Sequence, residues 1–530
     1  MTASRVKLNF YRPAAGYRLV FGYLGLFFIL VGIVCLLPLA FLAFYPEEAN
    51  VTWSFVIPGG SSVAIGLLLY FLLIFKKERD HLGKHQDSVL LVLVWMIAIL
   101  IGSVPFMLRG FPNNLGEYAM NANDAIFESA SGYTATGFSL FNFDTNAPGY
   151  HIYVIYRTIL IFFGGIGLVL VVTSALSDRY GLKLYSAEGH NDKLLPNLAK
   201  SARLILGLFT GFIAVGSFFY WIVGGLNWFD SINHSVCAVA TGGFSTVAGG
   251  LPQIIADTTY VNEIGLHPNG LAINIVSMVL MIMGATNFLL HLFLLSFKFK
   301  LVFKDIEMKF FFVSSIFFIS LMVVALFTSG SFTVGESFEQ GSVLFLSALT
   351  TTGFNISTPI NNLPSSAIAI VIVAMIIGGG AGSTAGAIKQ YRVAIAIKSA
   401  YYSIRDRLAN RRKLFPHPFF RLGTDHELDQ DTSNEAFSYI FIYLVILFIG
   451  TIGITLAASI SGLNDIHFGS SIFEFSSAMA GVGLSIGVVG QSVAINWILI
   501  IGMFLGRLEI LPVSFAIYRV ARDIARKETN

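Results

Sequence analysis

The stretch "SALTTTGFNIST", Ser347 to Thr358, decides how this sequence is interpreted, because its pattern occurs four times. Each copy has a helix-compatible run, a triplet drawn from Thr, Ala, Gly and Val, a glycine and a large apolar residue. Aligned without a gap, the copies are "DAIFESASGYTATGFS" (124–139), "DSINHSVCAVATGGFS" (230–245), "QGSVLFLSALTTTGFN" (340–355) and "SSIFEFSSAMAGVGLS" (470–485). The aligned glycines are Gly137, Gly243, Gly353 and Gly483. Such a repeat indicates one structural unit used four times.

The composition is that of a membrane protein. Of 530 residues, 55% are hydrophobic and 12% are charged, with a mean hydropathy of +0.74; a soluble chain carries about twice that charged fraction. Continuous apolar runs that can cross roughly 30 Å of hydrocarbon predict helices rather than barrel strands. We expect an all-α polytopic membrane protein with about ten transmembrane helices. They are predicted at 19–45, 55–75, 89–108, 151–176, 204–226, 271–295, 310–327, 367–388, 437–460 and 494–517.

The distribution of lysine and arginine predicts the orientation of these spans. The loops 46–54, 110–150, 227–270, 328–366 and 461–493 contain neither residue. Of the 33 lysine and arginine residues, all except Arg109, Arg157 and Arg507 lie in the segments on the opposite side of the membrane from these loops. By the positive-inside rule both termini are cytoplasmic. The first apolar run is too long for a signal-peptide core, so it predicts a retained helix. Cys35 and Cys237 indicate neither a disulfide nor a metal site.

Four outer loops each contain one copy, as an apolar stretch too short to cross the bilayer, which is typical of a re-entrant element. Backbone carbonyls that face an axis can replace the hydration shell of a cation, and glycine permits the positive φ angles that such a turn needs. The short helix before it points its negative end inward, which favours a cation. At the aligned start, Asp124, Asp230 and Ser470 are suitable N-caps and Gln340 is not.

The copies therefore predict a four-walled selectivity filter that holds cations through backbone carbonyl oxygens. The alternative is close helix packing, but packing glycines would lie inside spans at GxxxG spacing. The expected filter residues are Thr134, Ala135, Thr136, Gly137, Ala240, Thr241, Gly242, Gly243, Thr350, Thr351, Thr352, Gly353, Ala480, Gly481, Val482 and Gly483.

Together with other motifs, the four copies resemble the superfamily of potassium transporters that comprises the Trk, Ktr and HKT proteins. These motifs are "FFGGIGL" (162–168) after Arg157, "ATGGFST" (240–246), "TTTGF" (350–354), "GGGAGSTAGAIK" (378–389) and "GRLE" (506–509). The resemblance covers roughly residues 89–520 and implies four helix–pore loop–helix repeats around one pseudo-fourfold pore. An additional N-terminal helix pair makes the chain similar to the TrkH-type pore subunit, whereas "AGVGLS" (480–485) in the fourth copy looks closer to the Ktr form.

The implied architecture divides the chain into an N-terminal helix pair, four pore repeats and a basic cytoplasmic loop. Their bounds are 1–80 for the pair, 87–177, 200–298, 305–400 and 434–522 for repeats 1 to 4, and 401–433 for the loop. Repeat 3 includes an intramembrane gate loop. The basic loop is an ordinary positive-inside loop, a contact for anionic lipid, or a docking surface for a cytosolic subunit. Docking is expected at Arg405, Arg407, Arg411 and Arg412, or otherwise at Lys183–Arg203.

The resemblance implies K+ uptake across the plasma membrane of a prokaryote, with K+ ions in the filter and no covalently bound cofactor. It also implies a homodimer that rests on a cytosolic nucleotide-binding regulatory ring of the TrkA type, so that nucleotide acts only through this separate subunit. Membrane lipid is an expected partner and nucleic acid is not. In the HKT branch, serine in place of the first filter glycine accompanies a sodium preference, so Gly137 implies K+ over Na+.

The stretch "GGGAGSTAG", Gly378 to Gly386, interrupts the eighth span. Each glycine costs a helix about 1 kcal/mol relative to alanine, so the run predicts a break; a kink or a close helix crossing is the alternative to a functional role. The resemblance implies a flexible gate beneath the filter. Its expected residues are Gly378, Gly379, Gly380, Ala381, Gly382, Ser383, Thr384, Ala385, Gly386, Lys389 and Arg507.

Charged residues inside the spans need partners, because an unpaired charge there costs at least ~2.5–3.5 kcal/mol. The resemblance implies that Arg507 contacts the gate loop or its surroundings; the alternative is that Arg507 is only a structural anchor. Glu128 and Glu474 share one position in repeats 1 and 4, where repeats 2 and 3 have His234 and Leu344. We expect a hydrogen-bonding brace at this position rather than an ion-attracting group.

These observations favour a channel-like monovalent-cation transporter over two other classes. A broken-helix secondary transporter of a small solute, or a Na+-coupled cation symporter, would also show interrupted spans, but unwound at the midplane. An intramembrane enzyme needs a catalytic pair within the bilayer, whereas His291 and Glu509 are expected to be isolated. We therefore expect no enzymatic activity.

Overall fold

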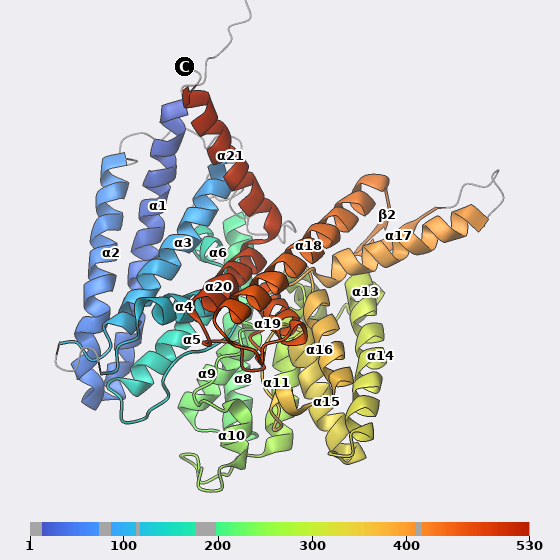
Figure 1. Ribbon diagram of the computed structural model, residues 1–530, viewed down its shortest axis with the longest axis horizontal. Coiled ribbons are helices and arrows are strands. Elements are labelled where there is room, and N and C mark those ends of the chain that lie inside the picture. The colour runs from blue at the N-terminus through green and yellow to red at the C-terminus, as the bar shows by residue number, and fades with distance from the viewer. Residues whose placement is uncertain (1–12, 74–85, 113–116, 176–197, 409–415, 529–530) are drawn as a thin grey trace, which may run out of the picture.

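The computed structural model describes residues 13–73, 86–112, 117–175, 198–408 and 416–528, which form a body of packed helices (Figure 1). The expected helical membrane fold is confirmed in these residues, with one exception. Strands β1 (Pro418–Arg421) and β2 (Thr424–Glu427) pair antiparallel inside the stretch predicted as a basic loop. Their two-residue turn has φ of 47° at Leu422 and 88° at Gly423, and positive φ at both central residues is what a tight hairpin requires.

Six helical stretches within the described ranges are long and apolar enough to cross a membrane by themselves. They contain α1 (Pro13–Leu36) with η1 (Leu37–Ala43), η2 (Pro46–Val51) with α2 (Thr52–Leu73), α3 (Gln86–Met107), α8 (Leu198–Ile222), α14 (Ile306–Thr328) and α18 (Gln430–Ile460). Each coincides with a predicted span.

The other four predicted spans are broken helices, although the sequence predicts an interruption only in the third of them. They are α5 (Tyr150–Ile166) with α6 (Leu168–Ala175), α11 (Gly270–Ala285) with α12 (Phe288–Leu295), α16 (Ser365–Ile377) with α17 (Gln390–Leu408), and α20 (Val493–Leu508) with α21 (Ile510–Glu528). The second and fourth pairs bend by 113° and 101°. The break after α11 has a local cause: the Asn287 side chain accepts a hydrogen bond from the Leu289 N–H, and such a cap starts a new helix.

A short helix lies between each pair of flanking helices and forms the first part of one of the four copies. These short helices are α4 (Ala122–Tyr133), α9 (Trp228–Val239), α15 (Val334–Leu349) and α19 (Phe468–Ala480). We call α3–α4–α5, α8–α9–α11, α14–α15–α16 and α18–α19–α20 units 1 to 4 (Figure 1). The connections contain α10 (Gly250–Ala256), α13 (Phe299–Lys304) and η3 (Ile360–Asn362).

The N-caps of the short helices differ from the prediction. Asp124, Asp230 and Ser470 all lie inside their helices, so their prediction as caps is wrong. Helices α4, α9 and α15 are capped instead by Asn121, Asn227 and Thr333, each of which accepts a hydrogen bond from the backbone three residues later. The two aspartates stand in the first turn, where the helix dipole favours a negative charge.

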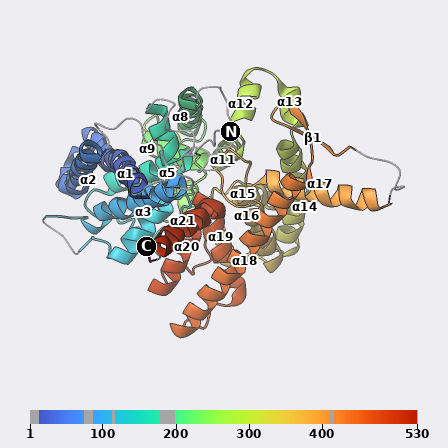
Figure 2. The same ribbon diagram turned by 90° about the horizontal axis from the view of Figure 1, so that it is seen from above.

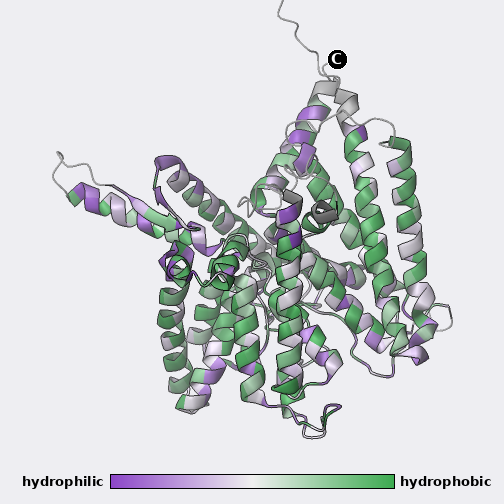
Figure 3. Cartoon of the chain, turned by 180° about the vertical axis from the view of Figure 1, so that it is seen from behind, coloured by the Kyte–Doolittle hydropathy of each residue, from purple (hydrophilic) through white to green (hydrophobic). Residues whose placement is uncertain are grey.

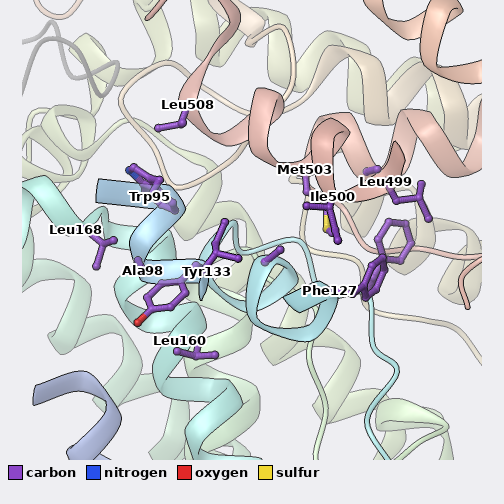
Figure 4. Close-up of a cluster of buried hydrophobic side chains, with 14 of the residues drawn as sticks. Trp95, Ala98, Phe127, Tyr133, Leu160, Leu168, Leu499, Ile500, Met503 and Leu508 are labelled. Atoms are coloured by element: carbon purple, nitrogen blue, oxygen red, sulfur yellow. The ribbon is translucent and has the colours of Figure 1, made fainter. Parts of the chain in front are cut away.

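A buried apolar cluster joins unit 1 to unit 4 (Figure 4). Among the helices that contribute side chains are α3, α4 and α5 of unit 1 and α20 of unit 4. They include Trp95, Ala98, Phe127, Tyr133, Leu160, Leu499, Ile500, Met503 and Leu508. Because units 1 and 4 are the first and last of the series, their direct packing closes the circle of units.

The surface of the helical body is polarised. Hydrophilic residues gather on α17, the hairpin and the C-terminal part of α21, and in smaller patches at the opposite end, whereas the long helices between are mostly hydrophobic (Figure 3). We call the end that holds α13, the hairpin and this part of α21 the basic end; α17 projects from it (Figures 1 and 2). Val313 of α14 and Phe441 of α18 are each 68% exposed, and apolar outer faces of this kind suit contact with lipid.

Candidate ion-conducting site

The backbone after each short helix has the same unusual conformation. The residue two positions before each aligned glycine has a positive φ, at Ala135 (53°), Thr241 (52°), Thr351 (57°) and Gly481 (70°). The aligned glycines follow with φ of 95°, 51°, 84° and 85°. Alternating signs of φ turn successive carbonyl groups toward one side of the chain, which suits a row of oxygen ligands. The sequence predicts positive φ at the glycines but not at Ala135, Thr241 and Thr351, where a side chain costs about 1–3 kcal/mol.

One hydrogen bond recurs at the start of all four loops. The N–H of the residue before each aligned glycine donates to the carbonyl five residues earlier, and the distance is 2.9 Å in every unit. The donor and acceptor pairs are Thr136 and Ser131, Gly242 and Cys237, Thr352 and Ser347, and Val482 and Ser477. The same bond fixes how each loop leaves its helix, although the side chains differ.

The aligned glycines bring the four loops into a closed ring, which we call the glycine ring. A Cβ on Gly137 would lie 2.7 Å from the Gly242 carbonyl oxygen of unit 2. The corresponding contacts run from Gly243 to Thr352 (2.5 Å), from Gly353 to Val482 (1.8 Å) and from Gly483 to Thr136 (2.2 Å). Each glycine therefore meets the same position in the next unit, and unit 4 returns to unit 1. The ring has no room for a side chain at any of the four.

A cavity of about 300 Å³ opens on one side of the glycine ring. All four aligned glycines line it, together with the residues that follow them in their loops, such as Ser139, Ser245 and Ser485. Arg157 is the charged residue of this lining. Among the described residues, no cluster of three or more His, Cys, Asp or Glu side chains could hold a metal ion, so the oxygen atoms available to a cation here are mainly backbone carbonyls and hydroxyls.

A buried polar side chain holds three of the loops from behind. Glu128 accepts hydrogen bonds from the Ser139 hydroxyl (3.1 Å) and from the Leu140 N–H. At the same position, Glu474 accepts from the Ser485 hydroxyl (2.5 Å), and His234 Nε2 lies 2.9 Å from the Ser245 hydroxyl. The predicted brace is therefore present in units 1, 2 and 4. Unit 3 has Leu344 at this position, and there the Ser347 hydroxyl bonds the Phe354 carbonyl instead.

The arginine of unit 1 has the partner that the sequence requires. Arg157 Nε donates to Glu128 Oε1 at 2.7 Å, and the two side chains are 1% and 0% exposed. Its other nitrogens donate to the Ser139 hydroxyl and, at 3.1 Å, to the Ser245 carbonyl of unit 2. The ring of Phe244 stacks 4.0 Å from the guanidinium carbon. Arg157 thus ties the loops of units 1 and 2 together.

The segment between α16 and α17, residues 378–389, lies against the ring on the side away from the cavity. The Thr384 hydroxyl donates to the carbonyls of Gly284 (2.9 Å) and Val239 (3.1 Å), and it accepts from the Thr241 hydroxyl. The Gly386 N–H donates to the Thr351 hydroxyl at 3.0 Å, and a Cβ there would lie 2.2 Å from the Ala480 carbonyl. The segment therefore touches the loops or short helices of units 2, 3 and 4.

The same segment is anchored on its other side by helix ends. The Gly380 N–H donates to the Ala285 carbonyl at 2.8 Å, and Asn287 Nδ2 donates to the Ala381 carbonyl at 2.6 Å. Lys389, which has a φ of 80°, closes the segment by donating to its Ala385 carbonyl. Many backbone bonds thus replace the helix that the glycines interrupt.

A chain of contacts links this segment to the hairpin at the basic end. The Ala381 N–H donates to Glu307 Oε2 at 2.8 Å, and Glu307 Oε1 lies 3.4 Å from Arg421 Nε. The neighbouring Asp305 accepts from the Leu422 N–H in the hairpin turn at 2.8 Å. Burial raises the pKa of Asp305. Sequence reasoning missed this link, because its three parts lie far apart in the chain.

Arg507 contacts the 378–389 segment. It donates to the carbonyls of Thr384 (3.3 Å) and Gly165 (2.9 Å), which join units 3 and 1. The expectation that Glu509 is isolated is wrong, because it pairs with Arg392 at 2.9 Å. The guanidinium of Arg392 also lies 3.8 Å from the centre of the Tyr439 ring. Glu509 and Arg392 are 117 residues apart, so no local pattern points to this pair.

The helical fold, with its four units, apolar outer faces and loop ring, defines a polytopic membrane protein of the cation-transport class. The chain belongs to the TrkH family of cation transport proteins, whose family model matches residues 59–521.

The chain is also similar to individual proteins over most of its length. The Trk system potassium uptake protein TrkH of Escherichia coli K12 is 25% identical over 513 residues, which cover 93% of this chain and 97% of that protein. An uncharacterized cation transporter of Methanocaldococcus jannaschii is 26% identical over 490 residues, covering 91% and 92% of the two chains. The crystal structure of the potassium transporter TrkH from Vibrio parahaemolyticus has the same fold, with a TM-score of 0.76, 22% identity, and coverage of 94% and 97%.

Proposed function

We propose that this chain is a channel-like K+ uptake protein, in which K+ crosses the glycine ring. The observation that carries the proposal is the closure of the ring by four loops with one φ pattern. Carbonyl rings replace the hydration shell of a stripped cation, and four similar walls suit the larger, more weakly hydrated K+. The names of the TrkH and TrkG relatives, which are potassium uptake proteins, support the same ion.

Reversal potentials of the purified protein in lipid bilayers test this function. With K+ and Na+ gradients in opposite directions, the potential should follow the K+ gradient. Protein-free bilayers are the control. A wild type that conducts Na+ as well as K+ when each is supplied alone would contradict the proposed selectivity, and absence of K+ current would contradict the function.

The four broken helices favour one second candidate, a symporter that couples K+ to Na+ or H+, because interrupted helices are typical of secondary transporters. The same bilayers separate the two. A channel-like protein reverses at the K+ equilibrium potential whatever the Na+ or H+ gradient, whereas a symporter shifts with the gradient of the coupled ion.

We further propose that residues 378–389 form the gate. Their contacts with units 2, 3 and 4 on the side away from the cavity support this role. Deleting Gly382 and Ser383 should raise K+ flux without changing the ion preference, because the ring itself is untouched. Unchanged or abolished flux in a folded deletion variant would count against a gate.

For partners, we propose a homodimer that docks a cytosolic nucleotide-binding ring at the basic end, in the cytoplasm of a prokaryotic cell. The names of the Trk-system relatives support this assignment, as do two basic residues of α17, the exposed Arg407 and the partly exposed Arg405. The contacts from Arg421 through Glu307 to Ala381 offer a route from the hairpin to the gate. Of the predicted docking residues, Arg405 and Arg407 are described, whereas Arg411 and Arg412 lie outside the described residues, as does most of Lys183–Arg203.

A further inference from the structure

Glu128 and Glu474 each accept a hydrogen bond from the serine at the equivalent loop position, Ser139 in unit 1 and Ser485 in unit 4. The charged groups around the two glutamates differ. Glu128 is neutralised by Arg157. We propose that Glu474 carries a negative charge whose counter-charge is the cation in the glycine ring, so that Glu474 is a positioning residue that raises the affinity for this cation. The inference rests on the proposed function, because it presumes that a cation occupies the ring.

The place of Arg157 in unit 4 is occupied by an apolar residue. A Cβ on Gly164 would lie 2.2 Å from the Tyr133 carbonyl, and a Cβ on Gly506 would lie 2.0 Å from the Met479 carbonyl. Both carbonyls belong to the residue four positions before the aligned glycine, so Gly164 and Gly506 are equivalent. Seven residues before them stand Arg157 and Leu499. Leu499 is fully buried in the cluster of Figure 4, so unit 4 lacks the arginine.

The elements packed on α19 supply no other cation near Glu474. Helix α16 has no ionisable residue, and neither has the loop 481–492. Helix α18 carries acidic residues near its start and the phenols of Tyr439 and Tyr443. In α20 the charged residue is Arg507, which binds the carbonyls of Thr384 and Gly165. The 378–389 segment meets Ala480 at the end of α19 and carries Lys389, which donates to the Ala385 carbonyl. Within the described part of the chain, the polar partners of Glu474 are hydrogen-bond donors such as the Ser485 hydroxyl and the Ile486 N–H.

A fully buried carboxylate needs a positive partner or a proton, because desolvation of a lone charge is costly. Each oxygen of Glu474 accepts a hydrogen bond, which offsets part of the cost of burying the ionised form. Ser485, which Glu474 holds, lines the same cavity as Gly483. Arg157 also lines this cavity but is already paired with Glu128, so a cation in the ring is the positive charge left for Glu474. A proton on Glu474 would remove this attraction, so protons and K+ compete.

The test is the substitution Glu474→Gln, which removes the charge and keeps the shape. The K+ concentration for half-maximal uptake into liposomes should rise roughly tenfold, as expected for the loss of one nearby charge in a partly desolvated site. In the wild type this concentration should rise as the external pH is lowered, and in Glu474→Gln it should not depend on pH. Asp465→Asn is the matched control: the carboxylate is exposed just before α19, and its removal should leave both properties as in the wild type.

A second measurement covers the case in which Glu474→Gln does not fold. Added K+ should raise the thermal midpoint of the detergent-solubilised wild type, because a ligand that binds the folded state stabilises it, and this rise should shrink at acid pH. An equal rise at both pH values would overturn the proposal. So would a Glu474→Gln variant with the wild-type half-saturation and pH profile, and in that case Glu474 is only a brace. Absence of K+ uptake by the wild type would instead overturn the proposed function.

Discussion

The loops of the glycine ring and the breaks of the returning helices are both fourfold features, but only the loops are alike. All four loops share the φ pattern, the 2.9 Å hydrogen bond and the contact to the next unit. The breaks are a single glycine at Gly167, a 113° bend at Thr286 and Asn287, the 378–389 segment, and a 101° bend at Glu509. A ring that surrounds one axis works only if its walls agree, whereas the breaks each contact different neighbours. One break can therefore differ from the others without disturbing the ring, which is compatible with the proposed gate at residues 378–389.

The third unit shows how the two features meet. Its loop lacks the acidic or histidine brace, because Leu344 replaces it. The same loop is held from the other side, where the Gly386 N–H donates to the Thr351 hydroxyl. We infer that the wall of unit 3 depends on the 378–389 segment more than the other walls do.

The largest effect is expected from breaking the brace of unit 1. Arg157→Met leaves Glu128 fully buried without its cation, and breaking a buried ion pair in this way costs about 3–5 kcal/mol. The thermal midpoint of the detergent-purified protein should fall steeply. Arg405→Met is the control, because that arginine is 29% exposed and its pair with Asp406 is worth about 0–1 kcal/mol. Equal midpoints for the two variants would show that Arg157 is not needed to hold the loops.

The second prediction tests why the ring requires glycine. The reason is either the close contact with the next loop, which leaves no room for a Cβ, or only the positive φ angle. Gly137→Ser places a Cβ 2.7 Å from the Gly242 carbonyl and should reduce the discrimination between K+ and Na+ by about 1–3 kcal/mol. Gly487→Ser is the matched control, since Gly487 has a φ of 96° but no atom within 4 Å of its Cβ position. Reversal potentials should shift for Gly137→Ser and not for Gly487→Ser. Similar shifts in both would mean that strain alone, not the ring contact, determines selectivity.

The contrast between loops and breaks also explains what the sequence could predict. The loops repeat, so four copies aligned without a gap predict their register and the positive φ of their glycines. Ala135, Thr241 and Thr351 carry no such signal, because ordinary residues adopt positive φ there only under the constraint of the packed loop. The sequence does contain a signal for the N-caps of α4 and α9, because Asn121 and Asn227 stand three residues before the aligned aspartates.

The breaks do not repeat, and their partners lie far away in the sequence. The asparagine in "ATNF" (285–288) is a usable signal for a helix start, but its contact with Ala381 is tertiary. The pair of Arg392 with Glu509, and the link from Glu307 to Arg421, join elements more than a hundred residues apart. Hydropathy predicts where such segments cross the membrane and not where they bend.

The third prediction concerns the contact of Glu307 with the proposed gate. Glu307→Gln keeps an acceptor for the Ala381 N–H but removes the charge, and a charge-assisted hydrogen bond is about twice as strong as a neutral one. The loss should be about 1 kcal/mol. K+ flux should increase several-fold at unchanged K+ over Na+ preference. Glu339→Gln is the control, because Glu339 accepts a hydrogen bond of the same length, 2.8 Å, from Asn274. A change in selectivity in Glu307→Gln would place this residue in contact with the ring rather than with a gate.

The smallest effect is expected at the basic end, where substitutions should change an association without changing the fold. Arg405 and Arg407 are solvent-accessible residues of α17, and Arg405 lies over the Tyr402 ring at 4.7 Å. Neutralising both to glutamine should leave the thermal midpoint and the ion preference of the chain unchanged, since exposed charges contribute about 0–1 kcal/mol each. The same change should weaken the binding of the cytosolic ring, mainly through a slower and less salt-dependent association. The exposed Lys298, which precedes α13, and Lys300, which lies within it, provide a control of equal charge at the same end. If only the lysine variant loses the ring in co-purification, docking lies at α13 and not at α17; if only the arginine variant does, the docking surface is next to the hairpin that reaches the gate through Glu307.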